Sequence, residues 1–236
     1  MDTIDTIGDT IARNWAATQE RVRRAAEVAG RDPRDIEVVA VTKTRTTSEM
    51  DEAILCGASA VGENRIQEAD AKKPHVHGQA TWHLVGHLQS NKAARAVTLF
   101  DLVQSVDSAR LAGALSRHAG IADRVLDILV QVNTSEAPGQ SGVNMDTLMP
   151  TLEEIATLEH VRVRGLMSIG AHSQDERLVR SGFSTLRTLS ERIGRAGIPN
   201  VEMRYLSMGM SGDFEWAIAE GANMLRLGSC LFGPRT

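Results

Sequence analysis

A lysine stands directly at the end of an apolar segment. Lys43 follows the run IEVVAVT at 36–42, which is too short for a helix and is typical of a strand buried on both faces. At the carboxyl end of such a strand, apolar neighbours desolvate the ammonium group and favour loss of its proton, as Schiff-base chemistry requires. A lone lysine in such a place is more often a solvated loop residue, so this interpretation needs support from other residues.

Two turns rich in glycine and serine follow the last two predicted strands. The first contains Gly209 and Ser211 within SMGMSG, and the second contains Gly228 and Ser229 within RLGS. In many α/β barrels, backbone amides and small side chains at these two places bind a phosphate group. The same residues also suit tight turns and helix caps, and the sequence leaves both interpretations open.

A charged residue lies within the last predicted strand. Arg226 stands between Leu225 and Leu227, so it points to the opposite face of the strand. If the leucines pack outward under helices, the guanidinium points into the barrel, where burial is costly unless it is paired. Its partner is either a group of the protein or the ring nitrogen of a ligand. A permanently charged donor would leave a pyridine nitrogen unprotonated, which weakens the ring as an electron sink.

Other polar residues lie in or after the second and third predicted strands. Glu63 and Asn64 come after the second strand, and His83 lies within the third. Helix capping and initiation explain residues of these types equally well. His75 and His77 form an H-x-H pair in a loop, but no cysteine or carboxylate accompanies them. We therefore expect no metal site.

A regular alternation of strands and helices positions these residues. Strands are predicted at 36–42, 58–62, 82–86, 102–106, 127–132, 163–169, 202–206 and 224–227. Helices are predicted at 9–29, 47–56, 63–73, 89–97, 108–119, 145–158, 173–196 and 212–220. This order implies parallel strands with right-handed crossovers.

The number of strand–helix units favours a closed α/β barrel over an open sheet. We expect one (β/α)8 barrel (TIM barrel) domain spanning 1–236, with the N-terminal helix of 1–35 packed on it. An open doubly wound sheet is the alternative, but no GxGxxG follows the first strand. The loop at 135–142, which follows the fifth strand, is expected on the face where barrel active sites lie.

The composition excludes several classes of protein. Hydrophobic residues make up 42% and charged residues 24%, with a net charge of −4. Aromatic residues make up only 3% and basic residues form only short pairs, so we expect no nucleic-acid partner. No apolar run reaches the length of about 18 residues that a membrane span needs. Cys56 and Cys230 form no disulfide framework, and the N-terminus lacks a signal-peptide pattern, so we expect a cytoplasmic protein.

Six spaced segments resemble one known family. VAVTKT, GENRIQE, WHLVGHLQSNK, QVNTSEAPGQSGV, GLMSIGAH and LSMGMSGDFEWAIAEGANMLRLGSCLFG are similar, in this order, to the pyridoxal-phosphate homeostasis family, whose members bind pyridoxal 5′-phosphate (PLP). The resemblance implies a barrel like the N-terminal domain of alanine racemase, which is fold type III among PLP proteins. Because the chain stops soon after the eighth strand, we expect that enzyme's second domain to be missing.

The resemblance also implies roles for single residues. Lys43 in VTKT resembles the lysine that forms a Schiff base with PLP, and Arg226 resembles the arginine that faces the pyridine nitrogen. Ser211, Gly228 and Ser229 resemble the residues that bind the phosphate. The remaining residues implied near the ring are Asn64, Met208 and Gly209.

We expect a carrier or regulator of PLP rather than an enzyme. A racemase needs a second acid–base group opposite the lysine. In alanine racemase-like enzymes a tyrosine from the partner's second domain supplies it, whereas the only tyrosine here is Tyr205, within the seventh predicted strand. Members of the family are implicated in cofactor and amino-acid homeostasis. We therefore expect a monomer that binds PLP reversibly and transiently meets PLP-dependent enzymes lacking their cofactor.

Two other functions remain open. A small PLP-dependent racemase or lyase would use Lys43 as one base and His83, His87 or Tyr205 as the other. An unrelated phosphate-binding barrel would leave Lys43 as a bystander. His87 stands where the family often has proline, and it either adds a titratable group near the pocket or faces solvent.

Overall fold

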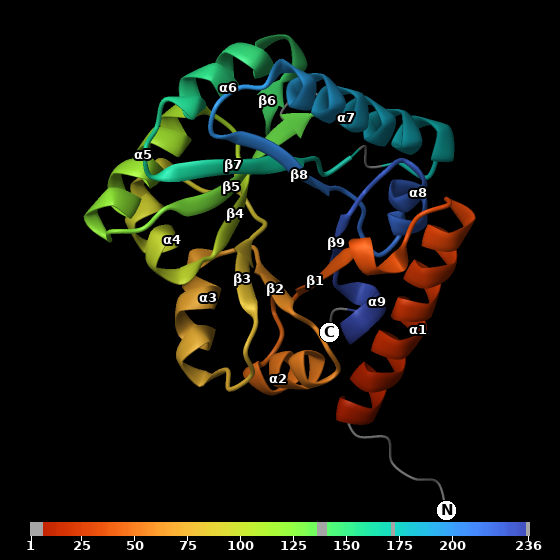
Figure 1. The fold of residues 1–236 in the computed structure, drawn as a ribbon. Helices are drawn as coiled ribbons and strands as arrows, with labels where there is room; N and C mark the ends of the chain where they lie inside the picture. Colours follow the sequence, from red (N-terminus) through yellow and green to blue (C-terminus); the bar gives the residue numbers. More distant parts are fainter. Residues whose placement is uncertain (1–6, 136–140, 171–172, 235–236) are drawn as a thin grey trace, which may run out of the picture.

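Eight parallel strands close into a barrel in the computed structural model, which describes residues 7–135, 141–170 and 173–234 (Figure 1). The strands pair in the order β4-β3-β2-β1-β9-β8-β7-β5, and a β4–β5 pairing closes the ring. The predicted (β/α)8 barrel is therefore confirmed. Its strands are β1 (Glu37–Val41), β2 (Ala60–Glu63), β3 (Thr81–Leu84), β4 (Leu102–Val106), β5 (Leu126–Asn133), β7 (Val161–Met167), β8 (Val201–Ser207) and β9 (Met224–Leu227).

Helices surround the strands (Figure 1). Helix α1 (Ile7–Val28) precedes the barrel and contacts α2, α8 and α9, with Ile11, Trp15 and Val22 buried at helical spacing. Within the described ranges, no helix has the length and apolarity needed to cross a membrane. The other helices are α2 (Thr47–Leu55), α3 (Ile66–Lys72), α4 (Ala93–Leu99), α5 (Ala109–Ile121), α6 (Leu148–Ala156), α7 (Glu176–Ala196), α8 (Phe214–Ala219) and α9 (Ser229–Phe232). Short 3-10 turns occupy Pro33–Asp35, Lys73–His75, Ser90–Lys92 and Met145–Thr147.

The strand register brings distant parts of the chain to one end of the barrel. Strand β1 lies between β2 and β9, with Val39 beside Arg226 and Val41 beside Gly62. Because the strands are parallel, the segments that follow them meet at the end formed by their carboxyl termini, which we call the mouth. Lys43, two residues beyond β1, therefore lies near the turn that follows β9.

The interior of the barrel contains an apolar layer and a polar layer. The apolar layer consists of Val39, Ala60, Leu102, Leu129, Met167 and Met224. Gln104 and Arg226 stand two residues further along β4 and β9 than members of this layer, and both are buried. The larger apolar core lies between the strands and the outer helices. Polar side chains are thus enclosed between the apolar layer and the mouth.

The structure differs from the sequence-based boundaries in a few places. Strand β2 runs through Glu63, so α3 begins at Ile66, whereas the pattern predicts a helix from position 63. Helix α7 begins at Glu176 because the Asp175 carboxylate accepts the N–H of Arg177 and caps it. The sequence pattern misses β6 (Val143–Asn144), a two-residue strand beside β5 that is too short to show periodicity. In the predicted loop, positions 136–140 lie outside the described residues.

Candidate functional site

A cavity of ≈ 350 Å³ opens at the barrel mouth. The structure brings together six residues predicted from the sequence on its wall, namely Lys43, Asn64, Ser211, Arg226, Gly228 and Ser229. A larger cavity of ≈ 700 Å³ lies at the opposite end, which we call the floor, and its lining includes Glu37, Arg204 and Tyr205. The mouth cavity is the better candidate site because a lysine, a buried arginine and two glycine-containing turns converge on it.

The chain is fixed on both sides of Lys43. Before it, the Thr42 hydroxyl donates to Glu63 Oε1 at 2.7 Å. After it, the Thr44 N–H donates to Glu68 Oε2 at 2.8 Å, and Thr44 adopts a left-handed φ of 63°. A threonine keeps this strained conformation only where its surroundings hold it. These contacts fix the backbone from which Lys43 projects.

An ion cluster of Glu63, Glu68 and Lys72 holds this segment against α3. Lys72 Nζ donates to Glu63 Oε1 at 2.7 Å, to Glu68 Oε2 at 3.3 Å and to the Thr42 carbonyl at 2.9 Å. The Glu63 side chain is 0% exposed and the Lys72 side chain 13%. Burial raises the pKa of Glu63, although Lys72 and Thr42 oppose this shift. Glu63 Oε2 has no hydrogen-bond partner in the part of the chain that the structure describes.

A serine joins the two turns rich in glycine and serine. Ser211 Oγ accepts the N–H groups of Gly228 at 3.1 Å and Cys230 at 3.3 Å. Gly209 has a φ of 94°, and a Cβ there would lie 2.6 Å from the Ala217 Cβ, so the turn requires glycine. Because these two amides already donate to Ser211, the donors that suit an anion are the hydroxyl groups of Ser211 and Ser229, which both line the cavity.

Arg226 forms the inner wall of the cavity. Its two terminal nitrogens donate to Ser207 Oγ at 2.7 Å and to the Ser168 carbonyl at 2.8 Å. Desolvation lowers the pKa of Arg226 to about 10, although Asp213 opposes the shift, so the guanidinium stays charged at neutral pH. These bonds use two of its five N–H donors, which leaves others to meet an acceptor in the cavity.

Two predicted ring neighbours do not line the cavity. Met208 is fully buried in the apolar core, and its N–H extends the sheet by donating to the Met224 carbonyl at 3.2 Å. The Gly209 carbonyl accepts the backbone N–H of Arg226 at 3.1 Å. The cavity is lined instead by Met210, two residues further on. The sequence does not separate the two methionines, because both lie beyond the end of β8 at Ser207 and the turn at Gly209, with its φ of 94°, decides which of them faces the cavity.

The side chains considered as a second acid–base group lie in different places. His83 is buried inside the barrel, and burial lowers its pKa to about 4, so it is neutral near neutral pH. Tyr205 lines the cavity at the floor. His87 lines two other cavities beside the mouth, with its side chain 57% exposed and Nδ1 3.3 Å from Asp107 Oδ2. Of these three residues, only His87 lies at the mouth.

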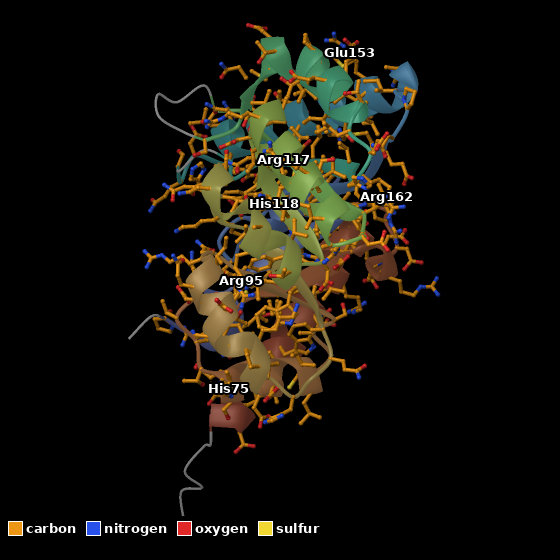
Figure 2. The ribbon with its side chains drawn as sticks, turned by 90° about the vertical axis from the view of Figure 1, so that its left-hand side faces the viewer. His75, Arg95, Arg117, His118, Glu153 and Arg162 are labelled. Carbon is orange, nitrogen blue, oxygen red and sulfur yellow. The ribbon has the colours of Figure 1, made fainter. Side chains whose placement is uncertain are left out.

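The remaining histidines of the described residues do not line the mouth cavity. Figure 2 shows His75 and His118 on separate elements of one outer face. Residues 7–135, 141–170 and 173–234 contain no group of three or more histidine, cysteine, aspartate or glutamate side chains that could hold a metal ion.

Comparison with known proteins identifies the family. The alanine racemase N-terminal domain matches residues 10–236. The pyridoxal phosphate homeostasis protein of Pseudomonas aeruginosa is 37% identical over 227 residues, which cover 96% of each chain. The chain belongs to the pyridoxal phosphate homeostasis protein family. The resemblance seen in the six sequence segments is thereby confirmed.

Solved structures of similar proteins agree with this membership. PipY of Synechococcus elongatus, solved with PLP bound, has a TM-score of 0.80 and 36% identity, covering 90% of this chain and 100% of that one. A protein of unknown function from Bifidobacterium adolescentis has a TM-score of 0.93 and 35% identity over 98% of both chains. Alanine racemase of Clostridium difficile, at 14% identity and a TM-score of 0.73, covers 94% of this chain and 56% of the racemase, and shows a shared fold alone.

Proposed function

We propose that the protein binds PLP in the mouth cavity, holds it as a Schiff base on Lys43, and acts in PLP homeostasis as a carrier or regulator. One observation carries the proposal: a lysine, a group of anion-binding donors and a buried arginine converge on one cavity. Membership of a family named for PLP homeostasis, with PLP bound in the related PipY structure, supports it.

The residues of the cavity fit the chemical groups of PLP. Ser211 and Ser229 offer hydroxyl donors for the phosphate, and Gly228, whose N–H donates to Ser211, lets the backbone approach it closely. The Lys43 amine suits the aldehyde, and Arg226 offers N–H donors for the ring nitrogen. The volume of ≈ 350 Å³ lies at the small end of the range for ligand sites, roughly 300–1,000 Å³. When bound, PLP supplies an aldehyde that captures amines and a ring that withdraws electrons.

The other predicted contacts take two different roles in this proposal. Asn64 lines the cavity with Lys43 and contacts the ring. Met208 and Gly209 act from behind the wall, since their backbone bonds to Met224 and Arg226 hold it in place. The ring thus meets a wall whose shape depends on backbone pairing between β8 and β9.

The surroundings of Lys43 favour holding PLP over turnover of a substrate. Racemisation needs a second acid–base group on the other face of the substrate. His83 is enclosed in the barrel and Tyr205 lies at the floor, so neither reaches the cavity. Arg226 donates to the ring nitrogen and keeps it unprotonated, which reduces the ability of the ring to stabilise negative charge.

A small amino-acid racemase or lyase is the second candidate function. It is favoured by one observation, the position of His87 beside the mouth with Asp107 3.3 Å from its ring nitrogen. That contact would fix the orientation of the imidazole ring. The exposure of His87 and its absence from the lining of the main cavity make this the weaker candidate.

The proposal includes the setting in which the protein acts. We infer a monomer in the cytoplasm that passes PLP transiently to PLP-dependent enzymes lacking their cofactor. The free thiols Cys56 and Cys230 support a reducing compartment. We propose neither a nucleic-acid partner nor a membrane partner for the protein.

Titration with PLP and exchange of amino-acid α-protons in deuterated water together test the proposal. We expect one PLP bound per chain in the wild type and in Lys92→Ala, a control lysine beside the mouth, and loss of the adduct in Lys43→Ala. We also expect negligible α-proton exchange. Rapid α-proton exchange in both enantiomers, lost in Lys43→Ala, would contradict the carrier function and favour a PLP-dependent enzyme. Absence of an adduct in the wild type would refute both the carrier and the enzyme function.

A further inference from the structure

A chain of hydrogen bonds crosses the barrel interior from the mouth cavity toward the floor. Arg226 donates to Ser207 Oγ at 2.7 Å, and the Ser207 hydroxyl donates to Gln104 Oε1 at 2.7 Å. Gln104 Nε2 lies 3.0 Å from His83 Nδ1, and His83 Nε2 lies 3.2 Å from Thr81 Oγ1. The first four of these side chains are buried. Strands β9, β8, β4 and β3 each contribute at least one member.

The chemistry of the donors gives this chain one direction. The guanidinium only donates, so the Ser207 oxygen accepts and its single proton goes to Gln104 Oε1. The amide nitrogen of Gln104 must then donate to His83 Nδ1. At the other end, the Thr81 hydroxyl donates to the Ser59 carbonyl at 3.2 Å, so its oxygen accepts from His83 Nε2–H. Both ends require the same neutral tautomer of His83.

We propose that Gln104 is a positioning residue for the PLP ring. Gln104 takes the proton of Ser207 and so turns the serine oxygen toward the Arg226 guanidinium. The guanidinium is thereby held in one orientation at the inner wall of the cavity. This inference rests on the proposed function, because the orientation of Arg226 matters to PLP only if the ring nitrogen lies opposite it.

The effect of Gln104 follows from cooperativity between hydrogen bonds. A hydroxyl that donates to a good acceptor is itself a stronger acceptor, and this polarisation is largest in a poorly solvated interior. Without Gln104, the Ser207 hydroxyl has no fixed acceptor and can rotate. Its proton can then point toward the Arg226 guanidinium and weaken the hydrogen bond between the two side chains. The Ser168 carbonyl alone would then hold Arg226, through its other terminal nitrogen.

Three variants separate this role from a general contribution to folding. Gln104→Leu removes the acceptor for Ser207 at similar volume. Gln104→Glu keeps a carboxyl oxygen as the acceptor for Ser207. Ser105→Ala is the matched control, because Ser105 is the next residue of β4 and is equally buried. Its side chain donates to the Gly86 carbonyl, which is not part of the hydrogen-bond chain from Arg226 to Thr81.

PLP titration and the visible absorption band of the lysine adduct provide the readouts. We expect Gln104→Leu to raise the Kd for PLP about tenfold and to shift the band. Gln104→Glu should restore both, with a Kd within about threefold of the wild type, and Ser105→Ala should change neither. A folded Gln104→Leu protein with the wild-type Kd and band overturns the proposal but leaves PLP binding intact. Absence of an adduct in the wild type instead refutes the proposed function.

The tautomer of His83 provides a test that needs neither PLP nor a variant. Nitrogen-15 NMR of the wild-type protein at neutral pH distinguishes the two neutral tautomers and the cation. We expect His83 to carry its proton on Nε2. A proton on Nδ1, or a cation, would overturn the proposed chain even if Gln104→Leu fails to fold.

Discussion

Replacing Lys72 with methionine tests whether the buried ion cluster holds the segment around Lys43. The Glu63 carboxylate is fully enclosed and Lys72 Nζ lies 2.7 Å from it. Removal of one partner of a buried pair leaves an uncompensated charge and costs about 3–5 kcal/mol. We expect Lys72→Met to lower the free energy of unfolding by about 3 kcal/mol near neutral pH. For a chain of this size, this corresponds to a fall in Tm of roughly 6–12 °C.

The pH dependence separates the loss of charge from the loss of packing. Burial raises the pKa of Glu63 in the folded protein above its unfolded value, and Lys72→Met removes a group that opposes this shift. For a carboxyl with a raised folded-state pKa, the stability is fully present below the unfolded pKa and is lost as pH rises through the folded-state pKa. The deficit of Lys72→Met should therefore be smallest near about pH 4 and should grow toward neutral pH.

Urea unfolding of a double-mutant cycle measures these effects. Lys72→Met, Glu63→Gln and their combination should show that the second change recovers most of the stability that the first removes, since no buried charge remains. Arg95→Met is the matched control, because Arg95 and Asp70 form an ion pair with side chains 52% and 42% exposed. We expect little change in the free energy of unfolding for that variant, because the exposed pair is screened by solvent. The reasoning would be refuted if Lys72→Met lowered the free energy of unfolding by less than about 1 kcal/mol. It would also be refuted if the double variant were less stable than Lys72→Met.

Three further substitutions probe the walls of the cavity. Gly209→Ala puts a Cβ 2.6 Å from that of Ala217 in a left-handed backbone, and thermal unfolding should show a loss of about 2 kcal/mol or more. Wild-type stability would mean that the turn relaxes. Ser211→Ala removes the hydroxyl that joins the two turns, and titration should show PLP affinity about tenfold lower; unchanged affinity would contradict a phosphate site there. His87→Ala should leave PLP affinity within about twofold over a range of pH, because the side chain is largely exposed. A larger loss would make His87 part of the site.

Local sequence patterns suffice for most of the fold. The apolar run at 36–42 became β1 (Glu37–Val41), and the amphipathic pattern at 9–29 became α1 (Ile7–Val28). Both signals lie within one element, so the sequence displays them directly. Strand β6 has only two residues, and the start of α3 depends on how far β2 pairs with its neighbours. Such features arise from contacts between segments and leave no periodic signal.

The candidate site also combines features that the local sequence shows with features that only contacts between distant segments create. Lys43 and Arg226 could be placed at the mouth because each stands at or near the carboxyl end of a predicted strand. The pairing of Glu63 with Lys72 could not be predicted, since it depends on how α3 is positioned along β2 in the folded barrel. The bond between Gln104 and Ser207 joins residues 103 positions apart in the chain. Only the closed barrel brings those two residues together.

Borohydride reduction of the PLP-loaded protein, followed by peptide mass analysis, tests the central claim most directly. Reduction converts a lysine Schiff base into a stable secondary amine, so the modified residue can be identified. We expect one pyridoxyl group per chain, on the peptide that contains Lys43. Modification of another lysine with Lys43 unmodified, or no modification at saturating PLP, would contradict the assignment of Lys43 as the residue that holds the cofactor.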